Sequence, residues 1–153
     1  MNAYLRKSCH PILSCAESAK WERSLLADDE SEWNAMSRVG RKLGAAIRSD
    51  YAMTRRRQSG LHVLGLIGKG HNGGDALLAL RELALRKELV ESVTLVISSP
   101  LGEMKPNARR AFDLLDRILI LETIAPSGED DAQWLQRVER VFSEREFDLC
   151  LDG

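Results

Sequence analysis

The stretch Gly68-Lys69-Gly70-His71-Asn72-Gly73-Gly74-Asp75 decides the fold of this chain. It follows the apolar run Leu61–Ile67 and leads into the apolar segment 76–83, which predicts a buried strand, a tight turn and a helix of residues 75–88. Glycines let a turn approach a ligand closely, and the amides at the start of a helix attract anions. The predicted occupant is a phosphate or diphosphate group, although the same glycines also suit a turn with a purely structural role.

The first three glycines of this stretch satisfy G-x-G-x-x-G, the fingerprint of dinucleotide-binding turns. An ordinary NAD-binding unit also places an acidic residue at the end of its second strand, where it holds a ribose hydroxyl. Here the second predicted strand, residues 93–97, ends in Ser98-Ser99-Pro100. A P-loop is excluded because glycine, and not Ser or Thr, follows Lys69. The run from Asn72 to Asp75 remains distinctive, and Asp75 can also cap the helix.

Apolar strands alternate with amphipathic helices through the rest of the chain. The predicted helices are residues 14–27, 32–57, 75–88, 106–115 and 129–144, and the predicted strands are 61–67, 93–97, 118–121 and 147–151. Such alternation implies a parallel sheet with helices on both faces, joined by right-handed crossovers. We therefore expect an α/β protein, a Rossmann-like three-layer α/β/α domain over residues 1–153, preceded by two N-terminal helices.

The two N-terminal helices carry clear signals of their own. Ser14 and Glu17 form a capping box at the start of the first helix, and the acidic stretch 28–31 separates it from the second. The second helix has apolar residues at a three-to-four spacing, which predicts one buried face made of Trp33, Met36, Val39, Leu43, Ala46 and Ile47. The fifth helix is expected to bury Trp134, Leu135, Val138, Val141 and Phe142 in the same way. Gly40 and Gly44 of the second helix predict close contact with another element.

Composition excludes several classes of protein. The chain has 153 residues, 44% of them hydrophobic, and a formal net charge of -1, so no global field favours nucleic acid or an anionic membrane. No stretch is long and apolar enough to span a membrane, and the N-terminus lacks the core of a signal peptide, which predicts a cytoplasmic protein. The three cysteines and three histidines show no zinc-binding spacing.

The glycine stretch resembles a known family, the YjeF N-terminal domains or NAD(P)H-hydrate epimerases, whose loop runs G-x-G-N-N-G-G-D-G. His71 stands where the family has its first Asn, Ala76 replaces the last Gly, and Arg81 falls where the family has a helix arginine. The opening helix contains Ala16-Glu17, which is similar to the A-E motif of the family. The stretch Met36-Ser37-Arg38-Val39-Gly40-Arg41 resembles the family motif M-E-N-A-G-R, with Ser37 and Arg38 in place of two polar residues that face the substrate cleft.

The resemblance implies an isomerase that interconverts the R and S epimers of hydrated NADH and NADPH, so that a stereospecific dehydratase can restore the cofactor. His71, Asn72, Gly73, Gly74 and Asp75 would form the substrate-binding loop. Asn72 and Asp152 would be ligands of a potassium ion, and Asp152, which comes directly after the fourth predicted strand, is the candidate general acid or base. Arg38 could meet a phosphate of the ligand.

Beyond Asp152 the family continues with D-A-x-x-G and later V-D-x-P-S-G, which this sequence does not contain. We therefore expect a fragment of a longer domain or the product of a decayed gene. Two other functions remain open: a non-catalytic relative that serves as a dimerisation, nucleotide-binding or RNA-binding module, and a plain Rossmann oxidoreductase. The sequence leaves undecided whether the domain is a homodimer, whether a dehydratase domain is fused to it, and whether it prefers hydrated NADH or hydrated NADPH.

Overall fold

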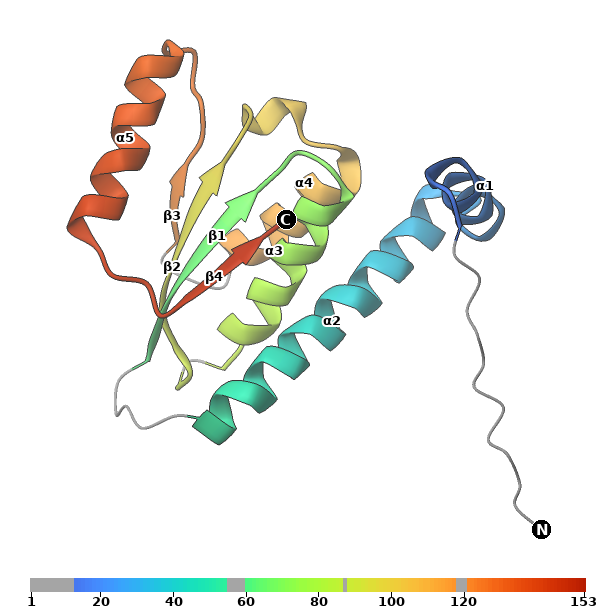
Figure 1. Cartoon of the computed structure of the whole chain (residues 1–153), viewed down its shortest axis with the longest axis horizontal. Coiled ribbons are helices and arrows are strands. Elements are labelled where there is room, and N and C mark those ends of the chain that lie inside the picture. Colours follow the sequence, from blue (N-terminus) through green and yellow to red (C-terminus); the bar gives the residue numbers. More distant parts are fainter. Residues whose placement is uncertain (1–12, 55–59, 87, 118–120) are drawn as a thin grey trace.

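The computed structural model describes residues 13–54, 60–86, 88–117 and 121–153 (Figure 1). The α-helices are α1 Cys15–Leu25, α2 Asp29–Thr54, α3 His71–Ala84, α4 Pro106–Asp116 and α5 Asp131–Glu144, with a short 3-10 helix η1 Leu101–Glu103. The strands are β1 Leu61–Ile67, β2 Val90–Ile97, β3 Leu121–Ile124 and β4 Leu149–Asp152. No helix in these described ranges is both long and apolar enough to cross a membrane.

The four strands form one parallel sheet in the order β3-β2-β1-β4. From β1 the chain first builds outward through β2 and β3, and then returns to the other side of β1 to form β4 (Figure 1). Ligands of open parallel sheets bind at such a reversal, beyond the carboxyl ends of the two strands that flank it. The predicted parallel sheet is confirmed, and its topology makes the ends of β1 and β4 the place to look for a site.

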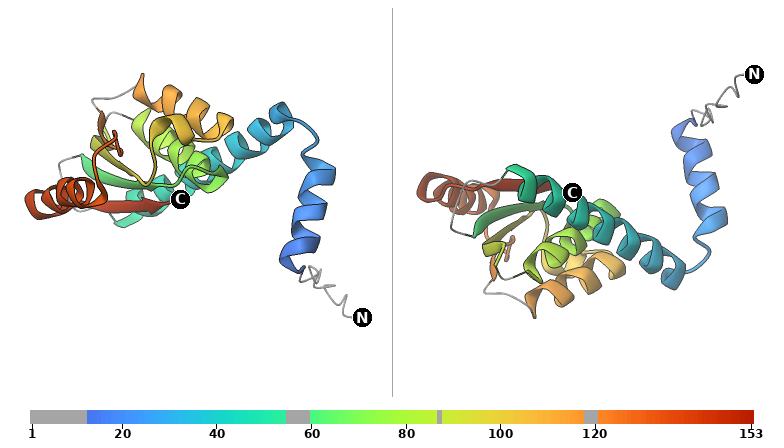
Figure 2. Two further views of the ribbon diagram at one scale, coloured as in Figure 1. Left: turned by 90° about the horizontal axis from the view of Figure 1, so that it is seen from above. Right: turned by 90° about the horizontal axis from the view of Figure 1, so that it is seen from below.

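The sheet is covered unequally on its two faces. On one face α3 lies directly on the strands, and α2 and α4 pack against α3 (Figures 1 and 2). Side chains without solvent exposure fill this side, among them Val63 of β1 and Leu77 and Leu80 of α3. The other face is covered by α5, whose Val141 packs against Leu64 in a smaller cluster. The structure thus has the expected three layers.

The start of α1 agrees with the predicted capping box. The Glu17 amide donates to the Ser14 hydroxyl at 3.3 Å, and the Ser14 amide donates to the Glu17 carboxylate at 2.8 Å. Nevertheless α1 has no buried residue, and it projects away from the rest of the protein (Figure 2). A capping box stabilises a helix locally, but it does not supply a surface on which the helix can pack.

The buried face of α2 differs from the one predicted. Trp33 and Met36 are buried, but Val39 and Leu43 are 48% and 41% exposed, and Ala46 is exposed as well. The reason is that α2 approaches α3 through its glycines. A Cβ added at Gly40 would lie 2.4 Å from the Cβ of Leu78, and one at Gly44 would lie 2.9 Å from the Ala79 carbonyl oxygen. Residues one step away from this contact therefore face outward, beside β4.

Several predicted boundaries were also wrong. The helix after the glycines begins at residue 71 and not at 75, α2 begins at 29 and not at 32, and β2 begins at 90 and not at 93. The described part of the third strand is residues 121–124, and residues 118–120 of the predicted strand 118–121 lie outside the described residues. On α5, Leu135 and Phe142 are exposed, so its buried face is narrower than predicted.

Candidate functional site

The candidate site begins where β1 and β4 end side by side. The Gly68 amide donates to the Gly153 carbonyl at 2.6 Å, and the Gly153 amide donates to the Leu66 carbonyl at 2.9 Å. The first hydrogen bond joins the residue that follows β1 to the residue that follows β4, and the second joins that same Gly153 to Leu66 within β1. The glycine stretch and Asp152 therefore meet at the reversal in strand order, where ligands of such sheets bind.

The glycines of this stretch are needed for space. A Cβ at Gly73 would lie 2.0 Å from the Gly68 carbonyl oxygen, and one at Gly74 would lie 2.5 Å from the sulfur of Met36. Neither has a positive φ, because Gly128 is the one glycine of the described chain with that conformation. Gly70 differs, since an added Cβ there would meet no atom within 4 Å. The backbone at Gly70 is thus open to a ligand, whereas Gly73 and Gly74 are buried and hold the turn against the protein.

The start of α3 carries the features of an anion site. Gly70 is the N-cap, without a hydrogen bond from a capping side chain, and the first intrahelical bond runs from the Gly74 amide to the Gly70 carbonyl at 3.2 Å. The three preceding amides of the helix therefore have no intrahelical acceptor, and they lie at the positive end of the helix dipole. This arrangement suits a phosphate, as predicted.

Asp75 does not cap this helix, contrary to one of its predicted roles. It lies within α3, where one carboxylate oxygen is buried and has no hydrogen-bond partner in the described structure. Burial raises the pKa of Asp75, and the nearby charge of His71 partly opposes this change. A buried carboxylate oxygen without a partner can accept a hydrogen bond from a ligand or bind a cation.

A groove of about 470 Å³ brings Asn72, Asp75 and Asp152 together. The remaining lining residues are Val39, Leu43, Ile47, Ala76, Leu149, Cys150, Leu151 and Gly153, from α2, α3 and β4. The exposed side chains of Val39 and Leu43 thus form one apolar wall of the groove. Burial raises the pKa of the Cys150 thiol, and the negative charge of Asp152 adds to this effect. The groove therefore combines an apolar wall with polar oxygens at one end.

Residues 33–153 match the family described as YjeF-related protein N-terminus. The chain belongs to this family. The resemblance inferred from the glycine stretch is thereby confirmed. The match begins at Trp33, so α1 lies before it, and the likeness of Ala16-Glu17 to the opening motif stays a prediction.

Two relatives show how much of a longer protein this chain covers. A protein of Gloeobacter violaceus named bifunctional NAD(P)H-hydrate repair enzyme Nnr is 33% identical over 102 residues, which are 67% of this chain and 18% of that protein. The crystal structure of yeast ynu0 superposes with a TM-score of 0.59 at 18% identity, over 83% of this chain and 51% of that chain. The yeast structure supports the fold. The chain spans about half of the yeast protein and less than a fifth of Nnr.

His71 replaces an Asn of the family motif, and its surroundings in the structure differ from those of its neighbour. Its Nε2 atom lies 3.5 Å from the Glu32 carboxylate of α2, and its side chain is 47% exposed. His71 is not among the residues that line the groove, whereas Asn72 is. Of these two residues predicted to bind the ligand, Asn72 thus lines the groove, whereas His71 contacts Glu32 and so links α3 to α2.

Ser37 and Arg38, which replace two polar residues of the family motif, do not line the groove either, whereas Ala76, which replaces its last Gly, does. Arg38 is exposed on α2. The residues that line a second, smaller pocket of about 260 Å³ on the α5 side of the β1–β4 junction are Leu66, Ile67, Gly68, Val96, Ser98, Trp134, Asp152 and Gly153. No pattern in the sequence predicted a site role for Ser98 or Trp134. The position of Ser98 directly after a predicted strand could have indicated a site role, because ligands bind at the carboxyl ends of parallel strands. For Trp134 the sequence shows only the helical spacing of apolar residues, which does not indicate a site.

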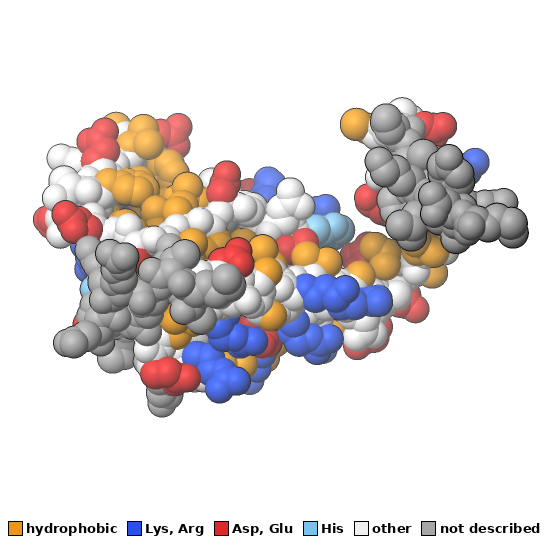
Figure 3. Space-filling model, turned by 60° about the horizontal axis from the view of Figure 1, so that its bottom comes forward, with side chains coloured by type: hydrophobic (Ala, Val, Ile, Leu, Met, Phe, Trp, Pro, Cys, Tyr) orange, Lys and Arg blue, Asp and Glu red, His pale blue; other side chains and the backbone are white. Residues whose placement is uncertain are grey.

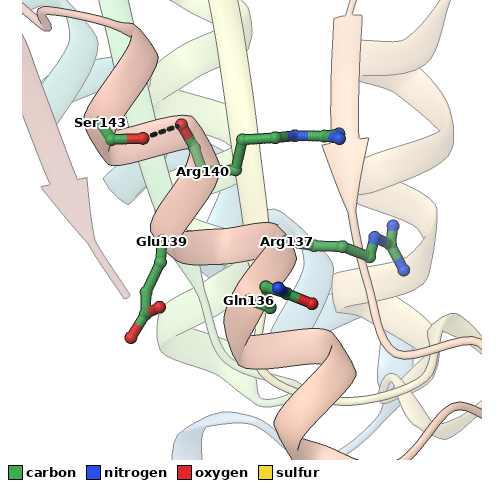
Figure 4. Close-up of a pocket in the computed structure, with 5 residues that line it drawn as sticks. All are labelled: Gln136, Arg137, Glu139, Arg140 and Ser143. Carbon is green, nitrogen blue, oxygen red and sulfur yellow. Dashed lines mark hydrogen bonds between the residues drawn. The ribbon is translucent and has the colours of Figure 1, made fainter.

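A larger hollow of about 590 Å³ lies along α5, away from the family motif (Figure 4). All of its lining residues come from this single helix: Gln136, Arg137, Glu139, Arg140 and Ser143. Arg137 is paired with Glu129 at 2.5 Å, and the Ser143 hydroxyl donates to the Arg140 carbonyl. The Ser127 hydroxyl, its amide and the charge of Arg137 lower the pKa of Glu129 to about 2. We assign no site to this surface, because no second element encloses it.

Proposed function

We propose that this domain is an NAD(P)H-hydrate epimerase, an isomerase that interconverts the R and S epimers of hydrated NADH and NADPH. The observation that carries the proposal is the joining of β1 to β4 through Gly68 and Gly153, which places Asp152 in one groove with Asn72 and Asp75. Membership of the family and the name of the Nnr relative support the same substrate class.

Each part of the site has a proposed task. The amides at the start of α3 bind the diphosphate of the substrate, because they have no intrahelical acceptor and lie at the positive helix end. Asn72 and Asp75 bind the rest of the nucleotide from the groove. Asp152 is exposed to the same groove. It transfers a proton at the hydrated ring carbon as general acid or base.

A potassium ion is part of this proposal. Asn72 and Asp152 would hold it, and the donor set fits a hard cation, since both residues supply oxygen and a third oxygen-bearing side chain, Asp75, lines the same groove. When bound, the ion would offset the negative charge of the substrate phosphates near two carboxylates. Exchange of potassium for a bulky organic cation should lower activity, and a rate that does not respond would remove the ion from the proposal.

The direct test is the rate at which the purified chain equilibrates one epimer of hydrated NADH. We expect equilibration above the spontaneous rate in the presence of potassium. Asp152→Asn keeps the size of the side chain but cannot take part in proton transfer, so it should lower the rate about 100-fold or more. The matched control is Asp116→Asn, because Asp116 is an exposed residue at the end of α4. A folded wild-type chain without any acceleration would contradict the proposal.

One observation favours a second candidate, the non-catalytic nucleic-acid-binding module. Residues 33–49 of α2 contain four basic residues and no acidic residue, and Arg38, Arg41 and Lys42 are exposed. Figure 3 shows Lys and Arg side chains gathered on one side of the molecule. RNA binding through this surface should weaken steeply as salt is raised. Such binding in a chain that fails to bind hydrated NADH would decide for the module.

A further inference from the structure

The smaller pocket on the α5 side of the sheet has a composition that the groove lacks. Leu66 and Val96 supply aliphatic walls, Trp134 supplies an aromatic one, and Ser98 and Asp152 supply polar groups. Its volume of about 260 Å³ is small for a whole dinucleotide but adequate for one ring. An apolar slot with a few polar groups is the usual environment for a flat ring that carries an amide.

Trp134 is the most informative residue of this pocket. It lies in the first turns of α5, where it packs against the cluster that contains Val96. Its indole nitrogen is buried and has no acceptor among the described residues. A buried N–H group without an acceptor costs about 1–3 kcal/mol, so native structures usually pair such a group. A ligand in the pocket can supply this acceptor once the indole nitrogen, which has no solvent exposure here, turns toward it.

The pocket and the groove meet at two shared residues, Asp152 and Gly153. A ligand whose phosphates lie at the start of α3 can thus extend past the β1–β4 junction and place a ring in the pocket. Asp152 would then lie between the two parts of the ligand. This position suits a carboxylate that acts on an atom of the ring.

We propose that this pocket is the subsite for the hydrated nicotinamide ring, with the Trp134 indole as its wall and as donor to the carboxamide oxygen. Ser98 supplies a second polar contact to the carboxamide. The proposal rests on the epimerase function proposed above, and it adds two residues that determine specificity for the ring. The hydrated nicotinamide is favoured over the adenine because Asp152, the proposed acid or base, lines the same pocket.

The test compares hydrated NADH with ADP-ribose, which keeps the adenine and the diphosphate but lacks the nicotinamide ring. Trp134→Phe retains an aromatic wall and removes the hydrogen-bond donor. We therefore expect it to lower the affinity for hydrated NADH about fivefold and to change the affinity for ADP-ribose by less than twofold. Ser98→Ala should act in the same direction, and since Ser98 is exposed the variant should fold normally. The control is Trp21→Phe on α1, where the side chain is 58% exposed and lines neither hollow.

A second readout follows the indole N–H signals by nuclear magnetic resonance. The Trp134 signal is the one that disappears in Trp134→Phe, and it should shift on addition of hydrated NADH but not of ADP-ribose. Unchanged affinity for hydrated NADH in both variants, or an equal loss for both ligands, would overturn the assignment of the ring. A wild-type chain that binds neither ligand contradicts the proposed function itself, and the assignment of the ring falls with it.

Discussion

The two faces of the sheet are built differently. On the α3 face three helices stack closely, and glycines at positions 40, 44, 73 and 74 leave no room for a side chain. On the α5 face one helix lies over the strands with a single buried residue, Val141. The α3 face therefore fixes the geometry of the loop, whereas the α5 face leaves space at its rim for the smaller pocket. Substitutions should therefore have large effects on the first face and small effects on the second.

The largest expected difference is between two leucines. Leu77 of α3 has no solvent exposure, and Leu77→Ala should lower the free energy of unfolding by about 3–5 kcal/mol, since it leaves a cavity in the main core. Leu135 of α5 is 49% exposed, and Leu135→Ala should change the free energy of unfolding by less than about 0.5 kcal/mol. Urea unfolding of both variants measures the contrast. Equal losses would show that α5 is packed as tightly as α3.

The next effect separates two glycines of the same loop. Gly73→Ala places a Cβ 2.0 Å from a carbonyl oxygen. We expect it to lower the free energy of unfolding by about 3 kcal/mol, because two backbone segments must move apart. The Cβ of Gly70→Ala would have no atom within 4 Å, so this variant should change the free energy of unfolding by less than about 0.5 kcal/mol. If Gly70→Ala nevertheless abolishes binding of ADP-ribose while the protein stays stable, the open side of the loop is the ligand side.

A moderate effect is expected at the centre of the α5 face. Val141→Ala removes two buried methyl groups and should cost about 2 kcal/mol in unfolding free energy. The affinity for ADP-ribose should not change, because Val141 lines neither the groove nor the smaller pocket. A parallel loss of nucleotide affinity would mean that the two faces are coupled.

The smallest expected effect concerns the pH dependence of stability at Asp75. Burial raises the pKa of Asp75 in the folded state above its ordinary value of 3.8, so the folded protein holds this proton more tightly than the unfolded chain. Stability is therefore lost as pH rises from about 3.8 through the folded-state pKa. The variant Asp75→Asn has no carboxyl group to ionise at this position, so it does not lose this stability as pH rises. Its stability relative to wild type should increase over this pH window and then level off, as measured by urea unfolding at successive pH values. A constant difference would place Asp75 in a solvated environment.

Much of the fold follows from local patterns in the sequence. The apolar run of β1, the capping box of Ser14 and Glu17, and the alternation of strands and helices each reflect interactions between residues close in the chain. For this reason the order of elements and the parallel sheet were predicted. The end of β4 at Asp152, one residue beyond the predicted strand, changes nothing in this order.

The failures share one physical cause, which is that periodicity says nothing about the partner of a helix. Val39 and Leu43 have the spacing of a buried face, yet α2 packs through Gly40 and Gly44, and the two larger residues line the groove instead. Asp75 was predicted at the helix start because the glycines before it were interpreted as a turn between strand and helix. The helix in fact includes Gly73 and Gly74, since both fit against neighbouring atoms without a side chain.

The sequence by itself determined the family, through the spacing of glycines around Asn72 and Asp75, and it determined that Asp152 follows a strand of the same sheet. Only the tertiary structure decided that β4 pairs with β1, because strand order depends on contacts between residues far apart in the chain. That pairing places Asp152 opposite Leu66 and Gly153 beside Gly68. It also creates the pocket at Trp134, since the pocket is enclosed by residues from β1, β2, β4 and α5 that no local pattern connects.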